Sequence, residues 1–203
     1  MINVEKFVIG ALENNTYLVD DNNGNCVVID PSYDGGALRA IIDKKNLKLQ
    51  GLLLTHGHFD HCGGVERLLT GITLPVWCGI EDVTLASHAS HNRWGIFAED
   101  CAVTDIIYAE TKEIVLGKMS FQVLHTPGHT LGSCCFFIDN FMFSGDTLFC
   151  NSIGRTDLSE SDDNLMKQSL SSIRKISYNF IVYAGHGEDS TLFEQFKTNR
   201  YIR

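Results

Sequence analysis

The sequence predicts an α+β fold in which two β-sheets pack face to face and helices cover their outer sides. The length of 203 residues suits a single domain built around one core. Hydrophobic residues make up 44% of the chain and charged residues 20%, which is typical of a soluble globular protein. Strand patterns followed by helical patterns occur in the first half of the chain and again in the second. Two packed sheets with outer helices accommodate this repeated order of strands and helices, with one sheet from each half of the chain.

The first half of the chain alternates between apolar strand patterns and helical patterns. Asp20–Asn25 contains only Asp, Asn and Gly, which predicts a hairpin turn. Pro31 ends the strand that follows, and Gly35-Gly36 precede a helix. Strands are expected at residues 2–9, 15–20, 26–31, 51–54 and 75–77, and helices at about 37–46, 62–69 and 80–88.

Strand patterns return after residue 105, and Asp139-Asn140 predicts a tight hairpin between two of them. Residues 89–104 have no readable pattern. His88 and His91, three positions apart at its start, would share a helical face, but no further ligand is close in sequence. We interpret them as surface or lid histidines. Strands are expected at 106–108, 113–116, 120–125, 133–138, 141–144 and 180–183, and helices at about 162–175 and from 190 onward.

Composition excludes several classes of function. A net charge of −9 disfavours nucleic acid as a partner, because phosphate contacts need a basic surface. No apolar run reaches the ~20 residues of a membrane span, and Met1–Lys6 has no export signal pattern, so neither a membrane nor secretion is expected. Seven cysteines without a CxxC pair argue against a disulfide framework. We therefore expect a cytoplasmic protein that binds neither nucleic acid nor a membrane; the oligomeric state, a homodimer included, stays open.

One stretch concentrates metal-ligand chemistry. The apolar run 51–54 ends in a segment that contains His56, His58, Asp60 and His61. Histidines at this spacing share no single face of a helix or strand, so they converge only where a strand stops and a loop turns sharply into a helix. Imidazoles and carboxylates are ligands of first-row transition metals. The stretch therefore predicts a metal site at a strand end.

Other polar residues occupy the same kind of position, directly after an apolar strand. Strand ends on one rim of a sheet collect into a single cleft, where active-site groups commonly lie. A lone histidine of this type is more often an ordinary core residue, but the repetition favours a shared metal site. The residues concerned are Asp30, His125, His129, Asp146 and His186.

Four separated motifs in this order resemble the metallo-β-lactamase superfamily. They are Thr55-His56-Gly57-His58-Phe59-Asp60-His61, Thr126-Pro127-Gly128-His129-Thr130, Ser144-Gly145-Asp146-Thr147 and Gly185-His186-Gly187. Within it, Gly145–Phe149 followed by Ile153–Asp157 is similar to the short glyoxalase II-like (hydroxyacylglutathione hydrolase-like) branch. The resemblance implies a four-layer αββα sandwich with two mixed sheets. It also implies one domain over 1–203, without the C-terminal glutathione-binding helical domain of full-length glyoxalase II.

The resemblance further implies two divalent metal ions, zinc in the first place, with iron or manganese accepted by the same ligands. Seven ligands are too many for a single tetrahedral zinc and suit two metals that share a carboxylate. Asp60 and Asp146 are assigned to catalysis as well as to metal binding. The implied sets are His56, His58 and His129 for one metal, Asp60, His61 and His186 for the other, and Asp146 between them.

The implied reaction is hydrolysis of a small, anionic acyl thioester such as S-lactoylglutathione by a metal-bound hydroxide. One alternative is a persulfide dioxygenase with a single iron, and another is an ester or lactone hydrolase of the same fold. A non-catalytic metal-binding module is the third. β-Lactam hydrolysis is disfavoured, because zinc β-lactamases place cysteine or serine where this chain has Asp146.

Supporting roles follow from position. Asp30 is expected to accept the free ring N–H of a ligand histidine. Thr55, Thr130 and Thr147 each adjoin a ligand. Their hydroxyls are expected to hydrogen-bond a ligand histidine in the same way, or the three threonines are present only because threonine favours strands. Arg155 is the predicted cation for a substrate carboxylate, although Asp157 is an equally plausible partner in a purely structural pair.

Overall fold

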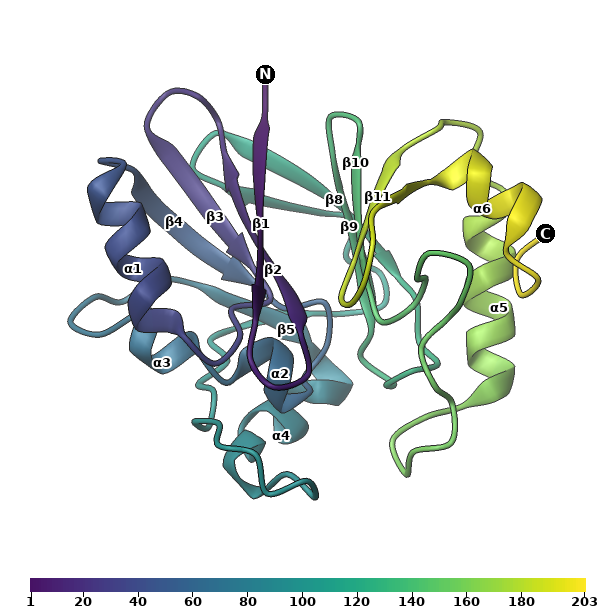
Figure 1. Cartoon of the computed structure of the whole chain (residues 1–203), viewed down its shortest axis with the longest axis horizontal. Helices are drawn as coiled ribbons and strands as arrows, with labels where there is room; N and C mark the ends of the chain where they lie inside the picture. The colour runs from purple at the N-terminus through teal and green to yellow at the C-terminus, as the bar shows by residue number, and fades with distance from the viewer.

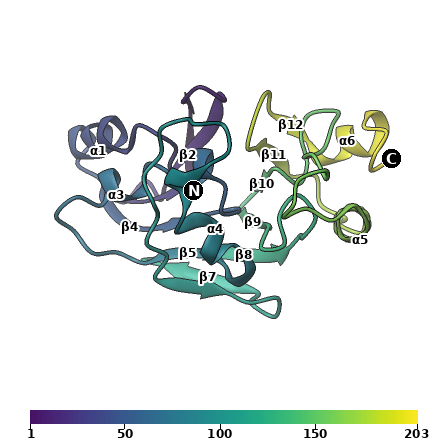
Figure 2. The ribbon, with the colours of Figure 1, turned by 90° about the horizontal axis from the view of Figure 1, so that it is seen from below.

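Two six-stranded sheets face each other and helices cover both outer sides in the computed structural model, which describes residues 1–203. Figure 1 shows α1 and α3 outside the first sheet and α5 and α6 outside the second. Figure 2 shows the same two halves after a quarter turn. The predicted four-layer αββα architecture with mixed sheets is confirmed.

The first sheet is formed by strands from the first half of the chain. In spatial order they are β1 (Asn3–Ile9), β2 (Asn14–Asp20), β3 (Asn25–Ile29), β4 (Lys48–Leu53), β5 (Val76–Gly79) and β6 (Asp105–Ile107). The helices of this half are α1 (Gly35–Lys44), α2 (Phe59–Cys62), α3 (Val65–Leu68) and α4 (Val83–Ala86), with 3-10 turns at Ile80–Asp82 and Ala89–His91.

The second sheet is formed by the second half of the chain. In spatial order its strands are β12 (Ser190–Thr191), β11 (Ile181–Ala184), β10 (Phe141–Gly145), β9 (Cys134–Ile138), β8 (Met119–His125) and β7 (Glu113–Leu116). Its helices are α5 (Asp163–Ile173) and α6 (Leu192–Thr198). Asp162 caps α5, because its carboxylate accepts the N–H groups of Asn164 and Leu165.

Strand direction brings the ends of several strands to one edge. Strands β3, β4, β5 and β6 are mutually parallel. Strands β8 and β10 both run antiparallel to β9, and β11 is parallel to β10, so β8, β10 and β11 share one direction. Residues that follow β8, β10 and β11 therefore emerge at the same edge of the second sheet.

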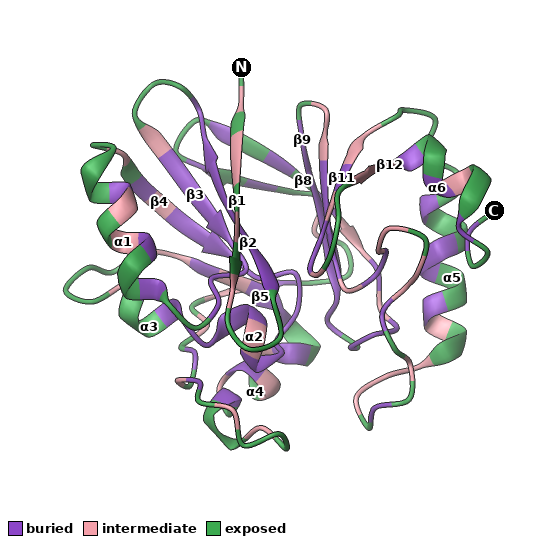
Figure 3. Ribbon diagram, viewed as in Figure 1, coloured by how far each residue is buried: buried purple, intermediate pink, exposed green.

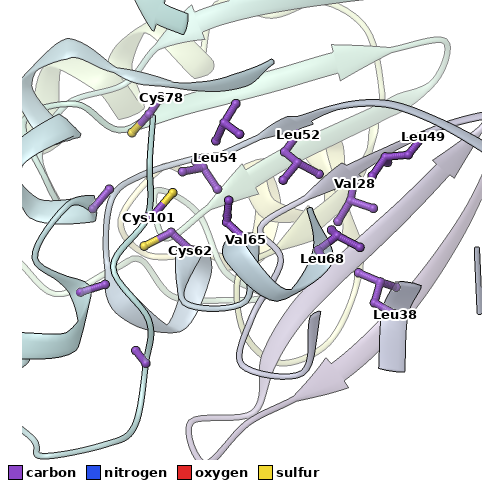
Figure 4. Packing of buried hydrophobic residues seen from close by; sticks show 14 of the residues in the cluster. Val28, Leu38, Leu49, Leu52, Leu54, Cys62, Val65, Leu68, Cys78 and Cys101 are labelled. Carbon is purple, nitrogen blue, oxygen red and sulfur yellow. The ribbon is translucent and has the colours of Figure 1, made fainter. Parts of the chain in front are cut away.

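Three apolar layers hold the sandwich together. The layer between the sheets contains the fully buried aromatic side chains of Tyr17, Phe121, Phe136 and Phe143. A second layer fills the space between the first sheet and its helices, where Figure 4 shows leucines of β4 beside α3. The third lies between the second sheet and α5. Figure 3 shows the resulting pattern, with buried strands inside and exposed outer helix faces.

The helix predicted at 62–69 differs from the structure in its start and its continuity. α2 begins at Phe59, and the chain is interrupted at Gly63-Gly64 before α3 begins at Val65. The interruption follows from packing, because a Cβ atom on Gly64 would lie 1.8 Å from the backbone oxygen of Ser32. Such close contact between two backbones requires glycine.

The remaining differences are local. The helix predicted at 80–88 divides into a 3-10 turn and α4, and the two-residue strand β12, which was not predicted, precedes α6. The hairpin at Asp139 is present, with a positive φ of 50° at that residue. None of the helices combines the length and apolar character needed to cross a membrane.

Candidate metal centre

The polar cluster that follows β4 lies where the chain turns from strand to helix. His56 and His58 lie in the turn, while Asp60 and His61 lie in α2. All three histidines are buried, with exposures of 1%, 6% and 0% in chain order. The strand-to-helix turn predicted from their spacing is therefore present.

Three residues from the second sheet reach the same place. His129 follows β8, Asp146 follows β10 and His186 follows β11. Within each of three groups, the potential donor atoms all lie within 4.8 Å of one another. These groups are His56, His58 and His129; Asp60, His61 and His186; and His56, His61 and Asp146.

Asp146 lies between the two outer groups. Its Oδ1 is 3.4 Å from Nε2 of His61, and its Oδ2 is 3.5 Å from Nε2 of His129 and 3.7 Å from Nε2 of His186. A single carboxylate thus contacts both sets of ligands, as a bridging ligand must. Gly185 makes room for it, because a Cβ atom there would lie 2.2 Å from Oδ1 of Asp146.

Each histidine of the cluster has one ring nitrogen beside a protein oxygen and the other turned toward the cluster. A metal-binding histidine needs this division, because the outer contact fixes the tautomer and the ring orientation. The outer contacts are His56 Nδ1 to Thr55 Oγ1 (3.2 Å), His58 Nε2 to Glu160 Oε1 (3.0 Å), His61 Nδ1 to Asp30 Oδ2 (2.9 Å), His129 Nδ1 to the Arg155 carbonyl (2.9 Å) and His186 Nδ1 to the Leu12 carbonyl (2.9 Å).

Three inward atoms have no hydrogen-bond partner although they are buried. They are Nε2 of His56, Nε2 of His61 and Oδ1 of Asp146. Buried polar atoms without partners are rare because each costs about 1–3 kcal/mol. Ligation of a metal ion would satisfy all three, so the donor set fits the divalent ions predicted from the sequence.

Asp30 connects a strand end to this cluster, as its position suggested. One carboxylate oxygen accepts the Thr55 N–H at 2.7 Å. The other accepts the Thr55 hydroxyl at 2.6 Å and lies 2.9 Å from Nδ1 of His61. Asp30 itself has a positive φ of 50°, an uncommon backbone conformation for a residue other than glycine. These contacts orient His61 with its Nε2 toward the metal centre.

The electrostatics of the cluster differ from one histidine to the next. Burial lowers the pKa of His56 well below its ordinary value, so its imidazole is neutral and ready to bind a metal. Burial acts in the same direction on His61, but the carboxylates of Asp60, Asp30 and Asp146 raise its pKa to about 10. Burial raises the pKa of Asp60, yet His61 and other imidazoles hold it well below its usual range.

Two predicted supporting residues have different surroundings in the structure. The buried Thr147 hydroxyl contacts the Thr126 hydroxyl at 3.0 Å rather than a ligand histidine. The Arg155 guanidinium donates two hydrogen bonds to Asp157, at 2.6 and 2.7 Å. Of the two roles expected for Arg155, the structure therefore contains the pair with Asp157. The contribution of Arg155 to the metal centre is its carbonyl, which holds His129.

Two acidic residues that the sequence did not single out support the cluster. Glu160 accepts from His58 and forms an ion pair with Arg93 at 3.1 Å. Asp82 is 2% exposed and accepts the Gly57 N–H at 2.9 Å and the Thr130 hydroxyl at 2.6 Å. It therefore ties the turn that follows β4 to the turn that contains His129.

Three other histidines lie outside the ligand groups. His125 contacts the Leu131 carbonyl at 3.1 Å and has no metal-ligand neighbours. His88 and His91 are exposed, and their ring centroids are 6.3 Å apart. They line a cavity of about 270 Å³ together with His58. Their exposure agrees with the interpretation of both as surface or lid histidines.

Comparison with known proteins gives matches over nearly the whole chain. Residues 9–186 match the family described as the Metallo-beta-lactamase superfamily. The chain is 30% identical to hydroxyacylglutathione hydrolase GloC of Haemophilus influenzae, with 99% of this chain and 98% of that protein covered.

Two solved structures are similar to this chain. One is BLEG-1, described as a B3 metallo-beta-lactamase, with a TM-score of 0.90, 28% identity and coverage of 100% and 99% of the two chains. The other is TTHA1623 in a di-iron-bound form, with a TM-score of 0.88, 34% identity and coverage of 98% and 100%.

Replacement of Asp146 tests its bridging position. Asp146→Asn should lower the content of both metals, because the shared ligand loses its negative charge. Elemental analysis of the purified variant measures this, with Asp157→Asn as the control, since Asp157 pairs with Arg155 at the surface. Unchanged metal content in Asp146→Asn would remove Asp146 from the bridging role.

Replacement of Asp82 tests the link between the two ligand turns. In Asp82→Asn an amide NH₂ group replaces one oxygen of the carboxylate that accepts from the Gly57 N–H and the Thr130 hydroxyl. The buried donor that loses its acceptor should lower the free energy of unfolding by ~1–3 kcal/mol. Urea denaturation of the metal-free protein measures the loss. Asp43→Asn is the matched control, because Asp43 forms an exposed pair with Arg39 and should change stability by less than ~0.5 kcal/mol. Equal stability of the two variants would contradict the proposed link.

Metal binding should release a proton from His61 at pH 7. Because pH 7 lies below a pKa of about 10, His61 holds a proton in the metal-free protein. Ligation requires the neutral ring, so the proton must leave and metal affinity must fall as the pH falls. Calorimetry in buffers with different ionisation enthalpies counts the released protons, and His125→Ala should leave that number unchanged. Metal uptake without proton release would show that His61 is already neutral.

Proposed function

The chain belongs to the metallo-beta-lactamase superfamily and is a metal-dependent hydrolase of that superfamily. From this premise we propose that it hydrolyses small acyl thioesters, S-lactoylglutathione among them, to a carboxylic acid and a thiol. One observation carries the proposal: Asp146 lies between two ligand groups, and the seven residues converge from the ends of four strands, β4, β8, β10 and β11. The similarity to hydroxyacylglutathione hydrolase GloC over 99% of the chain supports the choice of thioesters.

The charges of the ligands favour this chemistry. Two bound divalent ions would supply hydroxide at neutral pH and polarise the substrate carbonyl. Neutral imidazoles and the carboxylates of Asp60 and Asp146 compensate only part of the ionic charge. The remaining positive potential favours an electron-rich carbonyl oxygen and a departing thiolate. Zinc is the proposed metal, and the di-iron form of the similar structure TTHA1623 makes iron the second candidate.

The chain itself positions the reacting groups. Because Asp60 is ionised and lies 3.3 Å from Nε2 of His186, its carboxylate is fixed at the edge of the ligand cluster. In the overall reaction the oxygen of water bonds to the carbonyl carbon and the C–S bond breaks. The proton given up by water neutralises the departing thiolate. No serine or cysteine nucleophile is required.

A polar cavity beside His58 suits the polar part of a thiol. Its lining includes Arg93, which forms an ion pair with Glu160 and lies over the Trp94 ring, 5.2 Å from the ring centroid. Arg155 lines a separate cavity with Lys167 and Arg200. We retain Arg155 as a proposed contact for a substrate carboxylate and add Arg93, the cation that shares a cavity with His58.

We also propose a cytoplasmic location. All seven cysteines are free in the structure, and six of them are buried. Burial raises the pKa of Cys26 to about 12 and that of Cys135 to about 11, which keeps these thiols protonated and unreactive. Free thiols of this kind suit a reducing compartment.

Metal analysis combined with a substrate panel tests the proposed function. Protein purified without added metal should contain two ions per chain and hydrolyse S-lactoylglutathione or another acyl thioester. Removal of the metal with a chelator should abolish hydrolysis, and zinc should restore it. The panel also contains an ester, a lactone and a β-lactam, because BLEG-1 is described as a metallo-beta-lactamase. Asp146→Asn provides the inactive control.

The alternatives give different results in the same experiment. One iron per chain, with oxygen uptake on glutathione persulfide, would replace the proposal with a persulfide dioxygenase. Hydrolysis of the β-lactam or lactone without hydrolysis of any thioester would change the substrate class. A fully metallated protein that is inert on the whole panel would indicate a non-catalytic metal-binding module.

A further inference from the structure

An apolar cavity of about 290 Å³ adjoins the metal centre on the side of the β1–β2 turn. Three separate segments form its walls: the β1–β2 turn, the loop between β3 and α1, and the segment that follows the second 3-10 turn. Helix α2 provides the part nearest the metal ligands. The lining residues are Ile9, Gly10, Ala11, Leu12, Tyr33, Phe59, Asp60, Ile96 and Phe97.

Two residues of the cavity lining, Leu12 and Asp60, connect it to the metal centre. Asp60 belongs both to the cavity lining and to the ligand group with His61 and His186. The Leu12 carbonyl accepts from Nδ1 of His186 at 2.9 Å, so the β1–β2 turn is fixed to a ligand histidine. A substrate whose carbonyl lies among the ligands therefore has this cavity within reach of its adjoining group.

The walls of the cavity are held in place without a ligand. Tyr33 and Phe97 form an edge-to-face pair with ring centroids 5.6 Å apart. The guanidinium of Arg67 lies over the Phe97 ring, 5.2 Å from its centroid. Ile96 donates its N–H to the Asn92 side chain at 3.2 Å. The cavity is thus preformed, which reduces the entropy cost of binding.

The chemistry of the walls selects an apolar occupant. Seven of the nine lining residues are hydrophobic, and the only charged one is the carboxylate of Asp60. Leu12, Tyr33 and Phe97 are 40%, 42% and 52% exposed, so an apolar group that enters the cavity covers apolar surface that now meets water. An anionic group would be repelled by Asp60 and would find no cation in the lining.

The volume limits the size of that occupant. A cavity of about 290 Å³ is slightly smaller than the ~300–1,000 Å³ of typical small-molecule sites. It accepts a short aliphatic chain or one aromatic ring rather than a protein segment. In a thioester, the group next to the carbonyl on the carbon side is the acyl chain, and the polar cavity beside His58 remains for the thiol.

We propose that this cavity binds the acyl chain of the substrate and makes the enzyme selective for apolar acyl thioesters of short to medium length. The inference rests on the proposed thioester hydrolysis and specifies its substrate class. Lactoyl thioesters remain substrates in this scheme, but the lactoyl hydroxyl group gains nothing from the cavity.

A chain-length series on one thiol tests the selectivity. The probes are acetyl, propionyl, butyryl, hexanoyl and lactoyl thioesters of N-acetylcysteamine, assayed with the zinc-loaded protein. The value of kcat/KM should rise by about three- to fourfold per methylene, and propionyl should match or exceed lactoyl, which has the same carbon count. A flat series, or a lactoyl value ten times that of propionyl, overturns the inference.

A variant of the cavity wall tests its location. Phe97→Ala should lower kcat/KM progressively more as the acyl chain lengthens, and the hexanoyl-to-acetyl ratio should fall by about fivefold or more. Phe193→Ala is the matched control, because Phe193 is 38% exposed on α6 and lies outside the cavity. It should keep the wild-type ratio. An unchanged ratio in Phe97→Ala places the acyl chain elsewhere.

A binding measurement separates this inference from the proposed function. Ethyl, butyl and hexyl thioethers of N-acetylcysteamine cannot be hydrolysed, and calorimetry should give an affinity that rises with alkyl length and loses that dependence in Phe97→Ala. If no thioester is hydrolysed, the proposed function fails whatever these thioethers do. If thioesters are hydrolysed but the thioethers show no dependence on length, the proposed function stands and the acyl site is wrong.

Discussion

The buried carboxylate of Asp30 joins the first sheet to the metal centre, and much of the site depends on it. It accepts both the N–H and the hydroxyl of Thr55, which fixes the path of the chain after β4, and it holds Nδ1 of His61. The same residue has a positive φ, so the backbone strain at the end of β3 is balanced by three hydrogen-bond donors. Loss of these contacts would free the turn that places His56 and His58 beside the ligands of the second sheet.

The metal centre depends equally on contacts between the two sheets. Asp82, in the first half of the chain, binds backbone and hydroxyl donors on both sides of the cluster, and Glu160, in the second half, holds His58. His58, His186 and the turn that contains His129 are therefore each supported by a residue from the opposite half of the chain. Because the carboxylates near His61 favour a proton in its ring, metal binding and proton release are coupled.

The sequence motifs and the family that they resemble were sufficient to predict the architecture, and they singled out the polar residues, such as Asp146, that the structure gathers at strand ends. The sequence was insufficient where only tertiary contacts decide. Asp82 lies in an unremarkable predicted helix, and Glu160 lies in a polar loop, so no pattern indicates that either binds a ligand turn. The break at Gly64 follows from contact with a distant backbone. The segment 89–104 has no periodicity because side-chain packing against other elements, rather than regular hydrogen bonding, fixes its course.

The segment 89–104 contributes residues to both cavities beside the metal centre, the apolar one and the polar one. Phe59 lines both the apolar and the polar cavity, and its ring packs against Trp94 with centroids 5.4 Å apart. Phe59 also directly precedes Asp60 in α2, so the residue that separates the cavities is covalently adjacent to a candidate metal ligand. Residues 92–97 therefore pack against the same helix that contains Asp60. The walls of the proposed acyl cavity and the candidate ligand Asp60 thus belong to one packed unit.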